Sequence, residues 1–67
     1  MDINELFGNR VKEERIKQGL SQEKLANLAY IDRTYLPSIE KGNRNVSLLV
    51  AEKIAKALNI QLIDLLK

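Results

Sequence analysis

The 67-residue chain contains neither cysteine nor histidine. Disulfides and thiolate metal sites are therefore excluded, and the commonest general base near neutral pH is also missing. The sequence has no glycine-rich phosphate loop and no evident pair of catalytic carboxylates, and its serines have no histidine to activate them. We therefore expect no metal, no cofactor and no enzymatic activity.

A strong charge of one sign and a long apolar run are absent too. The 11 basic and 9 acidic residues leave a net charge of +2, which is too small to indicate a nucleic-acid partner by itself. No apolar run approaches the ~18 residues that span a membrane, and the N-terminus has no apolar signal segment. We expect one domain over residues 1–67, located in the cytoplasm, with no membrane partner and no small-molecule effector.

Glycines and capping residues divide the chain into a succession of helices. Ser21, Asp32 and Ser47 are suited to N-cap positions, and Gly19 and Gly42 to helix ends. No segment alternates apolar and polar residues with a period of two, so the expected fold class is all-α. The five predicted helices cover about Ile3–Gln18, Gln22–Ala29, Arg33–Lys41, Leu48–Leu58 and Gln61–Leu66.

The second and third of these helices, over about 21–41, have the lengths and the short connection of a helix-turn-helix unit. In such units the first turns of the second helix face the base edges of the major groove. Here the sequence offers an arginine that can donate two hydrogen bonds to guanine, a threonine methyl for thymine, and further hydroxyl groups. The candidate base-reading residues are Arg33, Thr34, Tyr35 and Ser38.

Groups suited to phosphate stand before and after this pair of helices. Free backbone N–H groups at a helix start and a polar loop beyond a helix end can both hold phosphate oxygens. The alternative interpretation is a solvated helix face followed by an ordinary polar turn. The candidate phosphate-contacting residues are Ser21, Gln22, Lys41, Asn43, Arg44 and Asn45.

The run LSQEKLANLAYIDRTYLPSIEKGNRNVSL, from Leu20 to Leu48, resembles the lambda-repressor/Cro-like (XRE-type) helix-turn-helix family. The string DRTYL…IEKGNRN is most similar to the restriction–modification controller proteins of that family. The resemblance implies a compact five-helix DNA-binding domain in which the second and third helices contact DNA. It also implies phosphate contact by Gln22, and a structural ion pair between Arg15 and Glu40 that joins the first helix to the end of the third.

Two residues depart from the family pattern. Tyr30 occupies a turn position that usually holds glycine or asparagine, and a left-handed backbone there is strained for tyrosine. Pro37 lies inside the third predicted helix, where a proline typically costs ~3 kcal/mol. Both departures bear on how Arg33 and Thr34 are presented to DNA.

The C-terminal run NIQLIDLL carries more apolar residues than one short helix can bury in so small a domain. One interpretation is a core helix with a frayed end. We favour a dimer interface, because exposed apolar patches usually mark association and a twofold dimer suits a palindromic operator. The candidate interface residues are Ile60, Leu62, Leu65 and Leu66.

Together these features predict a homodimeric, sequence-specific transcriptional regulator related to the restriction–modification controllers. It would bind double-stranded DNA and place the helix at 33–41 in the major groove of a palindromic operator. The alternative is a protein-interaction module, such as an antitoxin-like domain, in which the C-terminal patch binds another protein.

Overall fold

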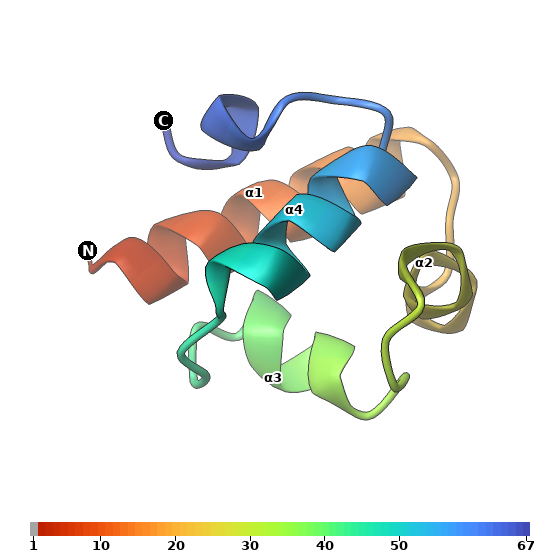
Figure 1. The fold of residues 1–67 in the computed structure, drawn as a ribbon, viewed down its shortest axis with the longest axis horizontal. Helices are drawn as coiled ribbons and strands as arrows, with labels where there is room; N and C mark the ends of the chain where they lie inside the picture. Colours follow the sequence, from red (N-terminus) through yellow and green to blue (C-terminus); the bar gives the residue numbers. More distant parts are fainter. Residues whose placement is uncertain (1) are drawn as a thin grey trace.

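Four α-helices and a one-turn 3-10 helix make up the computed structural model, which describes residues 2–67 (Figure 1). Met1 lies outside the described residues. No strand occurs within residues 2–67, so the predicted all-α class is confirmed, but the fifth predicted helix is a 3-10 turn and not an α-helix. None of the described helices is long and apolar enough to cross a membrane. The elements are α1 (Ile3–Lys17), α2 (Gln22–Ala29), α3 (Tyr35–Glu40), α4 (Leu48–Ala57) and η1 (Leu62–Leu65).

Local signals set the ends of most helices as predicted. The hydroxyls of Ser21 and Ser47 each accept a hydrogen bond from the backbone N–H three residues further on, at 3.0 and 3.1 Å. Each therefore satisfies one of the N–H groups that a helix start leaves without a partner. Gly19 and Gly42, which follow α1 and α3, have left-handed φ values of 72° and 78°.

The start of α3 corrects the prediction, because the helix begins at Tyr35 and not at Arg33. Asp32 caps the turn before the helix: its carboxylate accepts hydrogen bonds from the backbone N–H and the hydroxyl of Thr34, both at 2.9 Å. Pro37 is consequently the third residue of α3, in the first turn, where a backbone N–H has no intrahelical partner. The cost of an interior proline therefore does not arise.

Tyr30 ends α2 in the left-handed conformation, with φ 57° and ψ 42°. The turn is closed by the N–H of Ile31, which donates to the carbonyl of Ala26 at 3.0 Å. A residue other than glycine in this conformation costs roughly 1–3 kcal/mol. The Tyr30 side chain is 86% exposed, so burial of the ring does not offset that strain.

The helices pack in two crossed pairs, with α1 against α3 and α2 against α4, while η1 lies against α1 and α4 (Figure 1). Gly8 permits the close approach of α1 to α3, because a Cβ at this position would lie 2.1 Å from the carbonyl oxygen of Ile39. Side chains from all five elements meet in the core, which fixes α2 and α3 relative to each other. The largest fully buried residues are Leu25, Leu36, Ile39, Ile54, Leu58, Leu65 and Val11.

Candidate nucleic-acid interface

The predicted base-reading residues lie around the start of α3. Arg33 and Thr34 occupy the turn before the helix, and Tyr35 and Ser38 belong to its first four residues. Arg33 and Thr34 are exposed, Tyr35 is at the margin of exposure and Ser38 is half-buried. None of the four is packed into the core, so this face is open to a large ligand.

Tyr35 and Ser38 form one polar unit with Arg44, which comes from the loop after α3. The Arg44 guanidinium lies 4.4 Å from the centroid of the Tyr35 ring, in a cation–π contact. Its Nε donates to Ser38 Oγ at 3.3 Å, and Ser38 Oγ donates to the Tyr35 carbonyl at 2.9 Å. The loop cation is therefore held beside the helix face that is predicted to read bases.

Arg33 is paired with a carboxylate that sequence reasoning missed. Its Nη1 lies 3.0 Å from Glu23 Oε2, and the two side chains are 70% and 63% exposed. The sequence signal that could have indicated this pair is the acidic side chain of Glu23 in the first turn of α2. An exposed ion pair of this kind stabilises by ~0–1 kcal/mol, so Arg33 can leave Glu23 for a partner that binds it more strongly.

Thr34 is oriented by Asp32. Because the Thr34 backbone N–H and hydroxyl both donate to the Asp32 carboxylate, the pKa of that carboxyl lies below its ordinary value of 3.8. The nearby positive charge of Arg33 lowers this pKa further. With its hydroxyl proton directed at Asp32, Thr34 presents chiefly its methyl group to a ligand.

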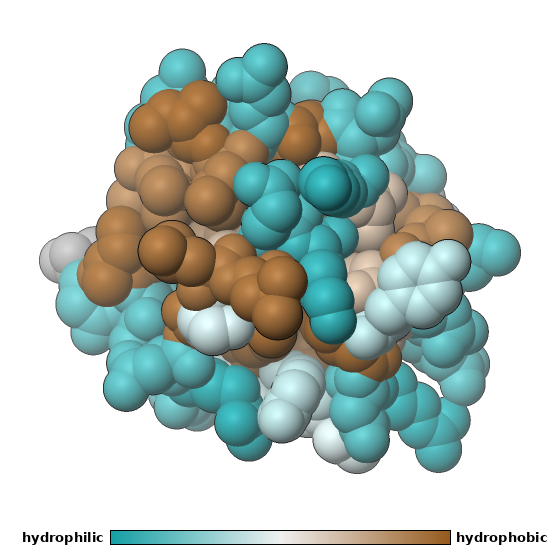
Figure 2. All heavy atoms as spheres, viewed as in Figure 1, coloured by the Kyte–Doolittle hydropathy of each residue, from teal (hydrophilic) through white to brown (hydrophobic). Residues whose placement is uncertain are grey.

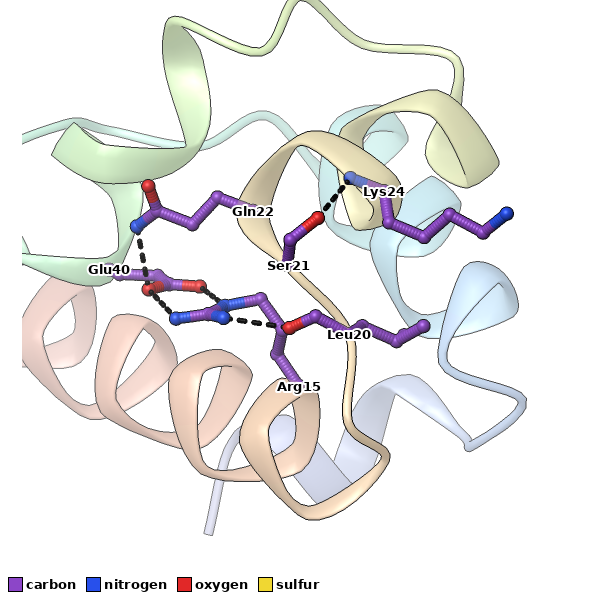
Figure 3. Close-up of polar contacts among 6 residues, drawn as sticks. All are labelled: Arg15, Leu20, Ser21, Gln22, Lys24 and Glu40. Carbon is purple, nitrogen blue, oxygen red and sulfur yellow. Dashed lines mark hydrogen bonds and ion pairs between the residues drawn. The ribbon is translucent and has the colours of Figure 1, made fainter.

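A buried network anchors this site to the rest of the fold (Figure 3). Arg15 Nε and Nη2 donate to the two Glu40 carboxylate oxygens at 2.6 and 3.1 Å, and Arg15 Nη1 donates to the Leu20 carbonyl at 2.8 Å. Gln22 Nε2 donates to Glu40 Oε1 at 3.0 Å. The carboxylate thus joins α1, the start of α2 and the end of α3. The family resemblance implied the arginine–glutamate pair and a role for Gln22 in orienting the third helix, but it did not give the hydrogen bond from Gln22 to Glu40.

The remaining predicted phosphate contacts lie at two places. Ser21 is exposed at the start of α2, where its hydroxyl is engaged as the N-cap. In the loop after α3, Asn45 Oδ1 accepts a hydrogen bond from Asn4 Nδ2 at 2.7 Å, which ties the loop to α1. The other exposed residues of that loop are Lys41, Asn43 and Arg44.

The predicted dimer interface needs a correction. Leu65 is 0% exposed because it is buried within its own chain, so it is not available to a second copy. Figure 2 shows apolar atoms gathered over the start of α4 and the C-terminal segment. The most exposed apolar side chains there are Leu48, Leu49 and Ile63, at 79%, 66% and 54%. Their half-buried neighbours are Ile60, Leu62 and Leu66.

Two short helices joined by a turn, with polar side chains exposed at the start of the second helix and further donors on both sides, define a helix-turn-helix protein. Comparison with known proteins agrees with this class. The model of the helix-turn-helix family matches residues 11–65, and the chain belongs to that family.

Its relatives include proteins that control restriction–modification systems. The control protein C.BamHI of Bacillus amyloliquefaciens is 52% identical over 66 residues, which cover 97% of this chain and 82% of that protein. The restriction-modification controller protein C.AhdI from Aeromonas hydrophila has a similar structure, with a TM-score of 0.89 and 47% identity over 92% of this chain and 94% of that one. The biofilm regulator SinR, solved in complex with DNA, matches with a TM-score of 0.86 and 34% identity over 91% and 98% of the two chains. The family is one of regulators and not of enzymes, as the missing histidine and cysteine predicted.

Proposed function

We propose that the chain is a homodimeric transcriptional regulator that reads DNA with the residues around the start of α3. One observation carries the proposal: Arg33 and Thr34 are exposed on the turn before α3, with Tyr35, Ser38 and Arg44 beside them. SinR, a family relative with the same fold, was solved in complex with DNA. In our proposal α3 lies in the major groove, as the second helix of a helix-turn-helix unit does.

Arg33 is the central reader in this proposal. Guanine offers O6 and N7 as two acceptors in the major groove, and a good bidentate contact discriminates by ~1–3 kcal/mol. That gain exceeds the ~0–1 kcal/mol of an exposed pair with Glu23, so a guanine can displace the carboxylate. A base without these acceptors leaves Arg33 paired with Glu23. The Thr34 methyl adds contact with a thymine methyl.

Phosphate contacts set the position of α3 on the duplex. Gln22, held by Glu40, and the N-terminal N–H groups of α2 face one strand, while the loop after α3 faces the other side of the groove. Each phosphate that a cation neutralises releases counterions, so affinity falls steeply with salt. The residues that we assign to phosphate are Ser21, Gln22, Lys41, Asn43, Arg44 and Asn45.

The apolar patch over α4 and η1 is the proposed dimer interface. Leu48, Leu49 and Ile63 are its exposed centre, and exposed apolar patches of this kind usually mark association. A twofold dimer built on this patch presents two copies of α3, which suits two half-sites about one helical turn (~34 Å) apart. Ile60, Leu62 and Leu66 complete the patch, and Leu65 supports it from within.

The biological role that the relatives favour is control of a restriction–modification system in the cytoplasm. This follows from the 52% identity to the control protein C.BamHI and the 47% identity to the controller C.AhdI. The matches cover 97% and 92% of this chain.

Selection of bound duplexes from a random pool tests the proposed function. We expect a palindromic sequence to be enriched, with a guanine in each half and half-sites about 34 Å apart. The same selection without protein is the control. A bound pool with no sequence preference would contradict sequence-specific reading, and an enriched site without symmetry would contradict the dimer.

A further inference from the structure

Tyr30 serves neither the core nor the reading face, although its backbone is strained. Its φ of 57° is a conformation that favours glycine, and its ring is 86% exposed. A strained backbone that presents an exposed side chain is a reason to look for a function at that side chain.

The ring stands at the edge of a groove between α2 and the second half of α4. The groove has a volume of about 180 Å³, and its apolar surface comes from Leu28, Ala29 and Ala57. Ligand pockets for small molecules are usually ~300–1,000 Å³, so this one has the size for a single large side chain. In Figure 2 a small apolar area over α2 is separated by hydrophilic atoms from the larger patch over α4 and η1.

Two lysines border the groove and give it a positive rim. Lys53 and Lys56 lie three residues apart on α4 and both line the groove. Neither takes part in an ion pair with another of residues 2–67. Lys53 and Lys56 are the only charged side chains among the lining residues, so the rim attracts negative charge.

We propose that this groove binds an acidic segment of another protein, anchored by one leucine or phenylalanine. The anchor fills the space between Leu28 and Ala57 and packs on the Tyr30 ring, and flanking carboxylates pair with Lys53 and Lys56. Aromatic residues are enriched at protein interfaces, where they give large contact area at low entropy cost. The apolar floor favours a protein segment over a DNA backbone, and the groove is lined by residues of α2 and α4 and by Tyr30, with none from the reading helix α3.

The test uses a short acetylated peptide of glutamates around a central Leu-Phe pair, added to the ¹⁵N-labelled full chain. We expect amide shifts to change at residues 28–31 and 53–57. Replacement of Leu-Phe by Ser-Ser in the peptide should abolish the shifts, and so should replacement of its glutamates by lysines.

Variants of the protein sharpen the test. Tyr30→Gly relieves the backbone strain, so it should fold, bind the peptide roughly tenfold more weakly and bind DNA unchanged. The double variant Lys53→Glu/Lys56→Glu should lose the acidic peptide and bind the lysine peptide instead. Ile16→Ser, which removes a 58% exposed apolar side chain on α1, is the control and should bind the acidic peptide normally.

Three results would overturn the proposal. The first is no peptide binding, or shifts that map elsewhere, such as on Leu48 and Leu49. The second is loss of DNA affinity in Tyr30→Gly, which would make the groove a DNA contact. The third is a change in the sedimenting mass of that variant, which would make the groove a contact between copies of this chain.

Discussion

The Arg15 guanidinium and the Glu40 carboxylate meet in a two-point contact at 2.6 and 3.1 Å, with side chains only 13% and 4% exposed. The same carboxylate accepts the Gln22 amide, so one buried group connects α1 to both helices of the DNA-binding unit. No buried side-chain nitrogen or oxygen among residues 2–67 lacks a hydrogen-bond partner, and this network is part of the reason. A fully satisfied network of this kind holds its members in one geometry.

Glu40→Gln should lower the free energy of unfolding by about 3 kcal/mol, because it leaves the largely buried Arg15 charge without a counter-charge. Urea unfolding followed by circular dichroism measures the loss. Glu13→Gln, which breaks the pair with Arg10 on the surface, is the control and should cost ~0–1 kcal/mol. Equal small losses in both variants would show that the buried pair does not anchor the fold.

Glu23→Gln should raise affinity for scrambled DNA by roughly two- to fivefold, because Arg33 loses its competing partner and the surface loses a negative charge. Affinity for the selected site should rise less, so discrimination between the two should fall. Fluorescence anisotropy with both duplexes at one salt concentration measures the change. Unchanged discrimination would mean that Glu23 does not compete with DNA for Arg33.

The Asp32 carboxyl should titrate below 3.8 in the folded chain, because it accepts two hydrogen bonds from Thr34. A carboxyl whose pKa is lowered by folding stabilises the fold when the pH is above the pKa of the unfolded chain. That contribution is lost as the pH falls below 3.8 and passes through the lower pKa of the folded chain. Carbon-13 NMR of the carboxyl follows the titration. In Thr34→Val only the backbone donor remains, so the pKa should rise but stay below 3.8. A titration at or above 3.8 in the original chain would refute the cap.

Leu49→Lys should convert the proposed dimer to a monomer, because a charge replaces a 66% exposed leucine at the centre of the patch while the core is untouched. Sedimentation velocity measures the mass. The control is Ile16→Lys, which places the same charge at a 58% exposed isoleucine on α1 and should leave the proposed dimer intact. If Leu49→Lys has the mass of the original chain, the interface lies elsewhere.

Much of the fold was predictable because its signals are local. The hydroxyls of Ser21 and Ser47 and the backbone freedom of Gly19 mark helix ends wherever the rest of the chain lies. The start of α3 was wrong by two residues because Asp32 can cap either a helix or a preceding turn, and both use the same side-chain acceptor.

The burial and the partners of individual side chains depend on tertiary packing, which the periodicity of the sequence does not predict. Leu65 and Ile63 belong to the same short apolar run, yet one is fully buried and the other is 54% exposed, because η1 is a 3-10 turn that directs Leu65 into the core. The contact of Glu23 with Arg33 joins α2 to the turn before α3 and depends on how that turn lies against α2. Side-chain chemistry thus predicted a reading face, while tertiary structure decided which partners its residues have.

The central claim is that Arg33 reads a base. It is tested most directly by the affinities of Arg33→Ala and of the original chain for the selected duplex and for a scrambled duplex. We predict a loss of ~1–3 kcal/mol on the selected duplex and almost none on the scrambled one, while Arg10→Ala, which removes an arginine from α1, changes neither selectively. Equal losses of Arg33→Ala on both duplexes would contradict the account, because Arg33 would then contribute only charge.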